Sequence, residues 1–162
     1  MSLEKENKLG KTRQFCSFYI ADRLFGIDIL DIREIKDEFS LTAVRHAPAE
    51  IRGLANIRGI ICLILDLRLI LGFDARAVDE MSRLILFKEK TGESFGVLVD
   101  QIGDIAEVDE DQIEDCISDE NSPPETGKKA DISAGICKLK DELLIILATE
   151  KVREVREVRS EK

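Results

Sequence analysis

The chain has 162 residues, of which 44% are apolar and 35% charged, and a formal net charge of −9 at pH 7. A chain of this length fits one domain, or two small lobes that share a core. It contains no Trp, one Tyr and seven Phe, so we expect a mainly aliphatic core.

The negative charge is concentrated in one part of the chain. No Lys or Arg occurs between Lys90 and Lys128. That interval holds twelve acidic residues: Glu93, Asp100, Asp104, Glu107, Asp109, Glu110, Asp111, Glu114, Asp115, Asp119, Glu120 and Glu125. An acidic surface repels phosphate groups, which argues against nucleic acid or an anionic membrane as the main partner.

The sequence carries no targeting or membrane-spanning signal. Met1–Gln14 is polar and charged, without the apolar segment of a signal peptide. The longest apolar run is far shorter than the ~20 residues that a membrane-spanning helix needs. Four cysteines, at Cys16, Cys62, Cys116 and Cys137, form no CxxC pair. We interpret them as reduced thiols used as small apolar side chains rather than as disulfides or metal ligands.

The N-terminal part predicts a leader followed by a hairpin. Met1–Arg13 is rich in Lys, Glu and Asn and is expected to be disordered. Phe15–Ile20 and Leu24–Asp28 are predicted strands joined at a tip formed by Asp22-Arg23. In Ile29–Ile35 apolar residues recur at a spacing of three, so a helical turn could enter a short strand, but the local pattern does not decide.

The next part surrounds an unusual apolar run. Phe39–Val44 is a predicted strand ended by the break His46-Ala47-Pro48, and Ala49–Ala55 is expected to be a short helix or turn. Ile60–Leu65 is apolar throughout, with glycine before it and charge after it. Such a run predicts a strand that is buried on both faces.

Beyond this run we expect a helical turn and a second hairpin. Leu67–Leu71 predicts one or two helical turns that Gly72 closes. Arg83–Lys88 and Phe95–Asp100 are apolar on both faces and are expected to pair across a turn at Thr91-Gly92-Glu93.

The C-terminal part predicts short strands, an acidic loop and a helix. Ile102–Val108 is a short apolar element, and Asp109–Asp131 is a long acidic loop. Ile132–Leu139 and Leu143–Thr149 flank a polar turn and form a predicted hairpin. Lys151–Lys162 has valines on one narrow stripe and is a predicted helix that frays at its end.

These elements predict an all-β architecture. Many short strands with little helix favour barrels or a sandwich, because both arrangements manage exposed sheet edges. We find no recognisable sequence period. The strands instead fall into two clusters, with Ile51–Gly72 near the boundary between them.

Motifs for catalysis are missing from the sequence. No GxGxxG or Walker-type loop occurs, and His46 is the only histidine available for a catalytic group. The acidic segment lacks the glycine and bidentate glutamate of an EF-hand, so we interpret it as a solvated loop. No cofactor or metal is expected. A hydrolase or metal-binding enzyme that uses the acidic segment is the least supported alternative.

Two charged residues stand out beside apolar ones. Glu34 lies between Ile32 and Ile35, and Arg58 precedes Gly59 at the mouth of the apolar run. Each could be part of a binding surface, or could be an ordinary surface ion pair or solvated charge.

The same residues belong to longer stretches with a family resemblance. The stretches are FGIDILDIREI (Phe25–Ile35), HAPAEIRGLANIRGIICLILDLRLILG (His46–Gly72), FGVLVDQIGDI (Phe95–Ile105) and ISAGICKLKDELLIIL (Ile132–Leu147). Their order and spacing resemble the CheW family of bacterial chemotaxis coupling proteins. The N-I-R-G core, followed by an apolar run and D-L-R, is the most specific part.

The resemblance implies a fold of two five-stranded SH3-like barrels around a shared hydrophobic core, with short helical turns and a C-terminal helix. It implies a CheW-like domain of two barrel lobes at 14–152, which follows the expected leader at 1–13 and precedes a C-terminal helix end or tail at 153–162. Leu63 departs from the family, which often has proline at that position. Such proteins are non-enzymatic adaptors in the cytoplasm, recruited to receptor arrays at the inner membrane. They join chemoreceptor signalling tips to the regulatory domain of the chemotaxis histidine kinase.

The resemblance also implies which residues bind the receptor, in a groove between the lobes. They are Ile32, Glu34, Ile35, Asn56, Arg58 and Gly59, with Val97 and Val99 as weaker candidates. It leaves open an alternative, in which the chain is a coupling or regulatory module of a larger chemotaxis protein.

Overall fold

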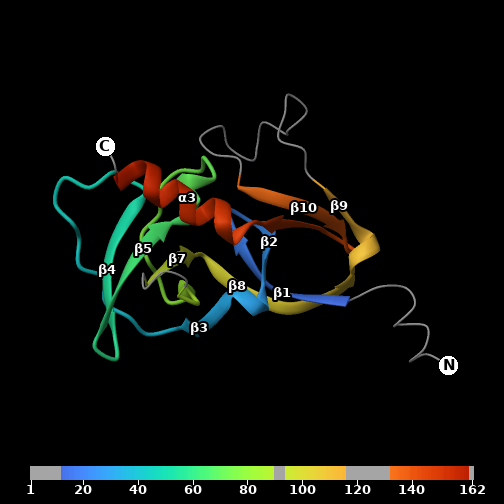
Figure 1. Ribbon diagram of the computed structural model, residues 1–162, viewed down its shortest axis with the longest axis horizontal. Coiled ribbons are helices and arrows are strands. Elements are labelled where there is room, and N and C mark those ends of the chain that lie inside the picture. The colour runs from blue at the N-terminus through green and yellow to red at the C-terminus, as the bar shows by residue number, and fades with distance from the viewer. Residues whose placement is uncertain (1–11, 90–93, 116–131, 161–162) are drawn as a thin grey trace.

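The computed structural model describes residues 12–89, 94–115 and 132–160, without the side chains of 115 and 155–160, and it consists of two β-sheets and short helices (Figure 1). The expected turn at Thr91-Gly92-Glu93, Cys116, most of the acidic loop and all but the end of the expected leader lie outside the described residues.

The first sheet, called lobe 1 here, has six strands in the order β8-β1-β2-β11-β10-β9. They are β1 (Thr12–Ile20), β2 (Arg23–Asp28), β8 (Gln101–Asp109), β9 (Ile113–Asp115), β10 (Ser133–Lys138) and β11 (Leu143–Leu147). The 3-10 turn η1 (Ile29–Asp31) follows β2, and the 3-10 turn η2 (Glu110–Gln112) follows β8. Helix α3 (Thr149–Ser160) follows β11.

The second sheet, called lobe 2, has five strands in the order β3-β6-β7-β5-β4. They are β3 (Ile32–Lys36), β4 (Ile51–Ile57), β5 (Ile60–Asp66), β6 (Arg83–Phe87) and β7 (Phe95–Val99), with helix α2 (Leu67–Ile70) after β5. The predicted all-β fold with two lobes is confirmed. Lobe 1 has one strand more than the expected five because β9 forms in the segment predicted to be an acidic loop.

The lobes are not successive along the chain, so the predicted boundary near Ile51–Gly72 is wrong. All of lobe 2 is inserted between β2 and β8 of lobe 1. The chain crosses from lobe 1 to lobe 2 through η1, and returns through the single residue Asp100.

Both lobes repeat one pattern of strand pairing. In lobe 1 the β1–β2 hairpin pairs in parallel with β11 of the β10–β11 hairpin, and β8 pairs with β1. In lobe 2 the β6–β7 hairpin pairs in parallel with β5 of the β4–β5 hairpin, and β3 pairs with β6. The two lobes therefore have the same arrangement of five strands, but the chain enters that arrangement at a different strand in each lobe.

One dipeptide recurs at the same place in both lobes. Phe25-Gly26 and Phe95-Gly96 occupy equivalent places, where each pair meets the parallel strand of its lobe. An added Cβ at Gly96 would lie 2.6 Å from the Ile85 carbonyl oxygen, which explains a glycine at that point.

The core explains why so many strands are apolar on both faces. Side chains of both lobes meet in a shared cluster that includes Phe18, Phe25, Ile85 and Phe87, and each lobe has a smaller cluster of its own. Along β6 the residues alternate, because Ile85 and Phe87 enter the shared core while Leu84 and Leu86 face the interior of lobe 2. Both faces of such a strand are removed from water, so no polar alternation remains.

Most predicted strands are confirmed, and η1 followed by β3 settles the segment that the pattern left undecided. The strand predicted at Phe39–Val44 is wrong, since only an isolated bridge from Thr42 to Leu54 forms there. The helix or turn predicted at Ala49–Ala55 is also wrong beyond its first two residues, because β4 begins at Ile51. β1 begins at Thr12, inside the expected leader.

The region after Asp66 follows the prediction closely. The Asp66 carboxylate caps α2 by accepting from the Arg68 N–H at 3.1 Å, and Gly72 closes the turn with a φ of 92°.

The Leu63 N–H donates to the Ser94 carbonyl at 3.0 Å, a bond that a proline at this position would lack.

Helix α3 ties the C-terminal part of lobe 1 to lobe 2. Val152 is buried in the shared core, and the Arg153 guanidinium lies over the Phe95 ring at 4.6 Å.

Among the described residues, no helix is long and apolar enough to cross a membrane. Cys16, Cys62 and Cys137 are buried free cysteines, and burial raises the pKa of the Cys16 thiol to about 11.

The shared core makes a prediction for Val97, which is 0% exposed. Val97→Ala should lower the free energy of unfolding by about 2 kcal/mol, because it leaves a cavity where the lobes meet. Val44→Ala, at an exposed valine, is the matched control and should change it by less than about 0.5 kcal/mol. Urea unfolding measures both, and equal effects would contradict the placement of Val97.

Candidate functional site

The β4–β5 hairpin ends in a tight turn that fixes the position of Arg58. Arg58 and Gly59 have φ values of 54° and 87°, and Ile57 pairs with Ile60 across them. Two central residues with positive φ suit the twist of a two-residue hairpin loop. The Asn56 side chain accepts from the Gly59 N–H at 2.8 Å and holds the turn.

Arg58 forms a two-bond ion pair with Glu34. Its Nη1 and Nη2 donate to Glu34 Oε2 and Oε1 at 2.7 and 2.6 Å. The Glu34 side chain is 19% exposed and that of Arg58 is 68% exposed. The hydrogen bond from Arg58 is the main cause that lowers the pKa of Glu34, and the same bond raises the pKa of Arg58.

This ion pair joins opposite edges of the lobe 2 sheet. Glu34 is on β3, and Arg58 follows β4, the strand at the other edge. Arg33 adds a second contact from β3, since its Nη2 lies 3.9 Å from the Cys62 sulfur on β5. The sheet therefore curls until its two edges meet at this end, as expected for a small barrel.

Glu34 contacts two guanidinium groups. Arg33 Nε is 3.5 Å from Glu34 Oε2, the oxygen that also accepts from Arg58 Nη1. Arg33 also approaches Glu89 at 4.0 Å, and Glu89 accepts from the Ser94 hydroxyl at 2.7 Å. The result is a charged cluster in which a carboxylate fixes an exposed arginine.

Exposed isoleucines lie on the same elements as this ion pair. Ile35 on β3 is 39% exposed, and Ile60 and Ile61 at the start of β5 are 44% and 55% exposed. The prediction that β5 is buried on both faces is therefore wrong at its first two residues. Sequence reasoning missed Ile60 and Ile61 as surface residues because they belong to an unbroken apolar run.

We name this surface the lobe 2 tip, formed by Glu34, Ile35, Arg58, Ile60 and Ile61. It combines exposed apolar side chains with a charge held in a fixed geometry, which are features of docking surfaces.

The other predicted site residues differ in their placement. Asn56 and Gly59 belong to the turn that supports Arg58, and Ile32 is half-buried against the shared core. Val97 and Val99 are 0% and 1% exposed in the shared core. They present no surface to a partner in this structure, because they lie on the face of β7 that points between the lobes.

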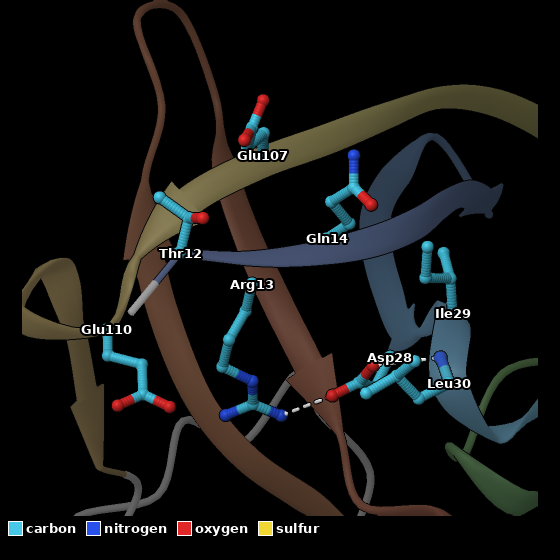
Figure 2. A pocket seen from close by; sticks show the side chains of 8 residues that line it. All are labelled: Thr12, Arg13, Gln14, Asp28, Ile29, Leu30, Glu107 and Glu110. Atoms are coloured by element: carbon cyan, nitrogen blue, oxygen red, sulfur yellow. Dashed lines mark hydrogen bonds and ion pairs between the residues drawn. The ribbon is translucent and has the colours of Figure 1, made fainter. Parts of the chain in front are cut away.

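A hollow on lobe 1 has a volume of about 590 Å³ (Figure 2). It is lined by Thr12, Arg13, Gln14, Asp28, Ile29, Leu30, Glu107 and Glu110. Figure 2 shows Arg13 pointing to Asp28, with which it forms an ion pair at 2.8 Å. The lining contains no pairing of a nucleophile with a base, so it offers no catalytic arrangement.

Metal chemistry has no support in the part of the chain that the structure describes. No group of three or more His, Cys, Asp or Glu side chains there is arranged to hold an ion. His46, the histidine considered for catalysis, is exposed. The arrangement at the lobe 2 tip can bind a partner but has no reacting group.

The lowered pKa of Glu34 predicts how the ion pair depends on pH. In the unfolded chain Glu34 has its ordinary pKa of 4.5, so the pair stabilises the folded chain above that pH. The contribution is lost as the pH falls through the lower pKa of the folded state. The stability difference between the parent and Arg58→Ala should therefore shrink below about pH 4.

Urea unfolding across this pH range measures the difference, and Arg23→Ala, an exposed arginine on β2, is the control. A difference between the parent and Arg58→Ala that stays constant down to about pH 2 would contradict the assigned pair.

Comparison with known proteins identifies the family. The CheW-like domain family matches residues 14–157. The probable chemotaxis protein CheW of Rhizobium etli is 33% identical over 103 residues, which are 63% of this chain and 65% of that protein. The chemotaxis protein CheW of Helicobacter pylori is 28% identical over 151 residues, covering 91% of this chain and 86% of that one.

A solved structure agrees with these relatives. The crystal structure of the scaffolding protein TtCheW from Thermoanaerobacter tengcongensis matches with a TM-score of 0.73 and 30% identity, over 83% of this chain and 88% of that chain. The matched stretch spans 65% of the length of the Rhizobium etli relative, slightly less than two thirds. The match over residues 14–157 shows that the chain belongs to the CheW-like domain family.

Proposed function

We propose that this chain is a non-enzymatic adaptor of chemotaxis signalling, which couples the cytoplasmic tips of chemoreceptors to the chemotaxis histidine kinase. Membership of the CheW-like domain family supports this function, as do relatives named chemotaxis protein CheW and a structural neighbour described as a scaffolding protein. The adaptor would work in the cytoplasm, at receptor arrays on the inner membrane. No observation favours the alternative of a module from a larger chemotaxis protein.

The observation that carries the proposal is the ion pair between Glu34 and Arg58 at the lobe 2 tip. A receptor tip is a helical hairpin, so its partner needs apolar contacts for one helix face and a few charges that fix orientation. Ile35 follows Glu34 on β3, Ile61 lies near the start of β5, and both are exposed apolar side chains. The lobe 2 tip thus offers both kinds of contact.

Arg58 is suited to contact the partner directly. A guanidinium has five N–H donors, and the two bonds to Glu34 leave others free to reach a helix carboxylate or carbonyl. Glu34 is mostly buried and holds the guanidinium in one orientation, so less side-chain entropy is lost on binding. In this proposal Arg58 binds and Glu34 positions it.

The role of Arg58 predicts a loss of coupling without loss of the fold. Arg58→Ala should reduce binding to a receptor signalling fragment by roughly 10-fold or more, because it removes the exposed charge of the surface. Co-sedimentation with the fragment and receptor-dependent kinase activity measure the effect. Arg23→Ala on lobe 1 is the matched control. Parental coupling by Arg58→Ala would show that the lobe 2 tip is not the receptor-binding surface.

The exposed isoleucines predict a separable effect on binding. Ile61→Ser should change the free energy of unfolding by less than about 1 kcal/mol, because the side chain is largely in water. It should nevertheless weaken partner binding, since an apolar contact is lost. Leu143→Ser, at an exposed leucine on β11 of lobe 1, is the matched control. Equal binding by the two variants would remove Ile61 from the proposed surface.

A further inference from the structure

The two places where the chain crosses between the lobes are each held by an acidic side chain. The first crossing is η1, which ends at Asp31, and the second is Asp100. In the repeated strand plan these crossings are equivalent, because each follows the second strand of the hairpin that carries the Phe-Gly pair.

Asp100 joins groups from both lobes through one oxygen atom. Its Oδ2 accepts from the Ala21 N–H at 3.0 Å, in the β1–β2 turn of lobe 1, where Ala21 has a φ of 53°. The same oxygen accepts from Arg68 Nη1 on α2 of lobe 2 at 2.5 Å. The side chains of Asp100 and Arg68 are mostly buried, so this pair is little screened by solvent.

Asp31 joins the lobes differently at the other crossing, because its side chain contacts lobe 1 and its main chain contacts lobe 2. Its Oδ2 accepts from the Thr149 hydroxyl at 2.9 Å, and Thr149 is the first residue of α3. Its carbonyl accepts from the Lys88 N–H at 3.0 Å, directly after β6 of lobe 2. In both crossings the acidic side chain therefore binds the helix that follows the parallel strand: Arg68 on α2 or Thr149 on α3.

Asp100 has a third, more exposed partner, Arg76, and this contact is called the outer arm here. Asp31 has no matching contact among the described residues. Arg76 Nη1 reaches Asp100 at 3.2 Å, while its Nη2 binds Asp79 at 2.8 Å. Arg76 is about half exposed, and it lies in the surface connection between α2 and β6. It is thus shared between a surface carboxylate and the junction of the lobes.

We propose that Asp31 and Asp100 are a pair of latches that set the orientation of the two lobes, and that the Asp100 latch can be released. Release would break the contacts to Arg68 and Arg76 and free the Ala21 N–H, while both sheets stay folded. The lobes would remain joined by the shared core and by the Asp31 latch, and the junction at Asp100 would open locally.

Amide hydrogen exchange in the full chain tests the Asp100 latch. Asp100→Asn keeps the size and one acceptor oxygen but removes the charge. Exchange should become ~10- to 100-fold faster at Ala21 and in α2, the change expected for a lost hydrogen bond to a charged group. Amides in β4 and β10, far from the junction in the strand order, should keep parental rates.

Two further variants complete the test. Asp79→Asn is the control, because it removes the surface partner of Arg76 and leaves the junction intact. Arg76→Gln removes only the outer arm and should raise exchange at the same sites by a smaller factor, which provides a result even if Asp100→Asn does not fold. Unchanged exchange in both junction variants would overturn the proposal, as would a uniform increase across both sheets.

A functional consequence rests on the adaptor role proposed above. If different partners contact different lobes, the latch sets the angle at which those partners face each other. Asp100→Asn should then bind the receptor fragment and the kinase separately as the parent does, but should form less of the three-component assembly. Faster exchange with normal assembly would keep the latch and reject this consequence, so the two ideas can fail separately.

Discussion

The packing of one hydrophobic core between two lobes is the constraint on which the rest of the structure depends. Strands such as β6 bury both faces, because one face lines the lobe and the other meets the opposite lobe. Helix α3 adds Val152 to the same core from lobe 1, and the Arg153 guanidinium lies on the Phe95 ring of lobe 2. Polar side chains cannot enter these positions without hydrogen-bond partners, so the charged residues of the proposed site lie outside the core, on β3 and in the β4–β5 turn.

The lobe 2 tip follows from this constraint. β5 has to leave the core at its start, and there Ile60 and Ile61 become exposed beside the turn that holds Arg58. The curled sheet brings β3 to the same place, so Glu34 can receive the guanidinium in two hydrogen bonds. A rigid core thereby presents a charge with little freedom of orientation, which suits the proposed adaptor role.

The sequence was sufficient to predict the strands with strong apolar patterns and the pairing of β6 with β7, but local patterns failed where tertiary contacts decide. β4 contains Gly53, whose backbone approaches the Thr42 carbonyl too closely for a side chain, and this contact is invisible in the sequence. Glu34 and Arg58 were singled out as unusual, yet nothing in their spacing indicated that the sheet edges meet. Val97 is a weaker binding candidate in the sequence, but β7 is buried at all five residues, so neither face of this strand reaches the surface.

The measurement that tests the central claim most directly is the charge-swapped pair Glu34→Arg with Arg58→Glu. The swap can keep the intramolecular ion pair and the curled sheet, but it presents a carboxylate where Arg58 is exposed. Co-assembly with a receptor signalling fragment and the chemotaxis histidine kinase, measured beside urea unfolding, separates fold from binding. We predict a chain that still folds, with some stability lost because Arg33 then lies beside an arginine, and little co-assembly. Parental co-assembly by the swapped chain would contradict the account.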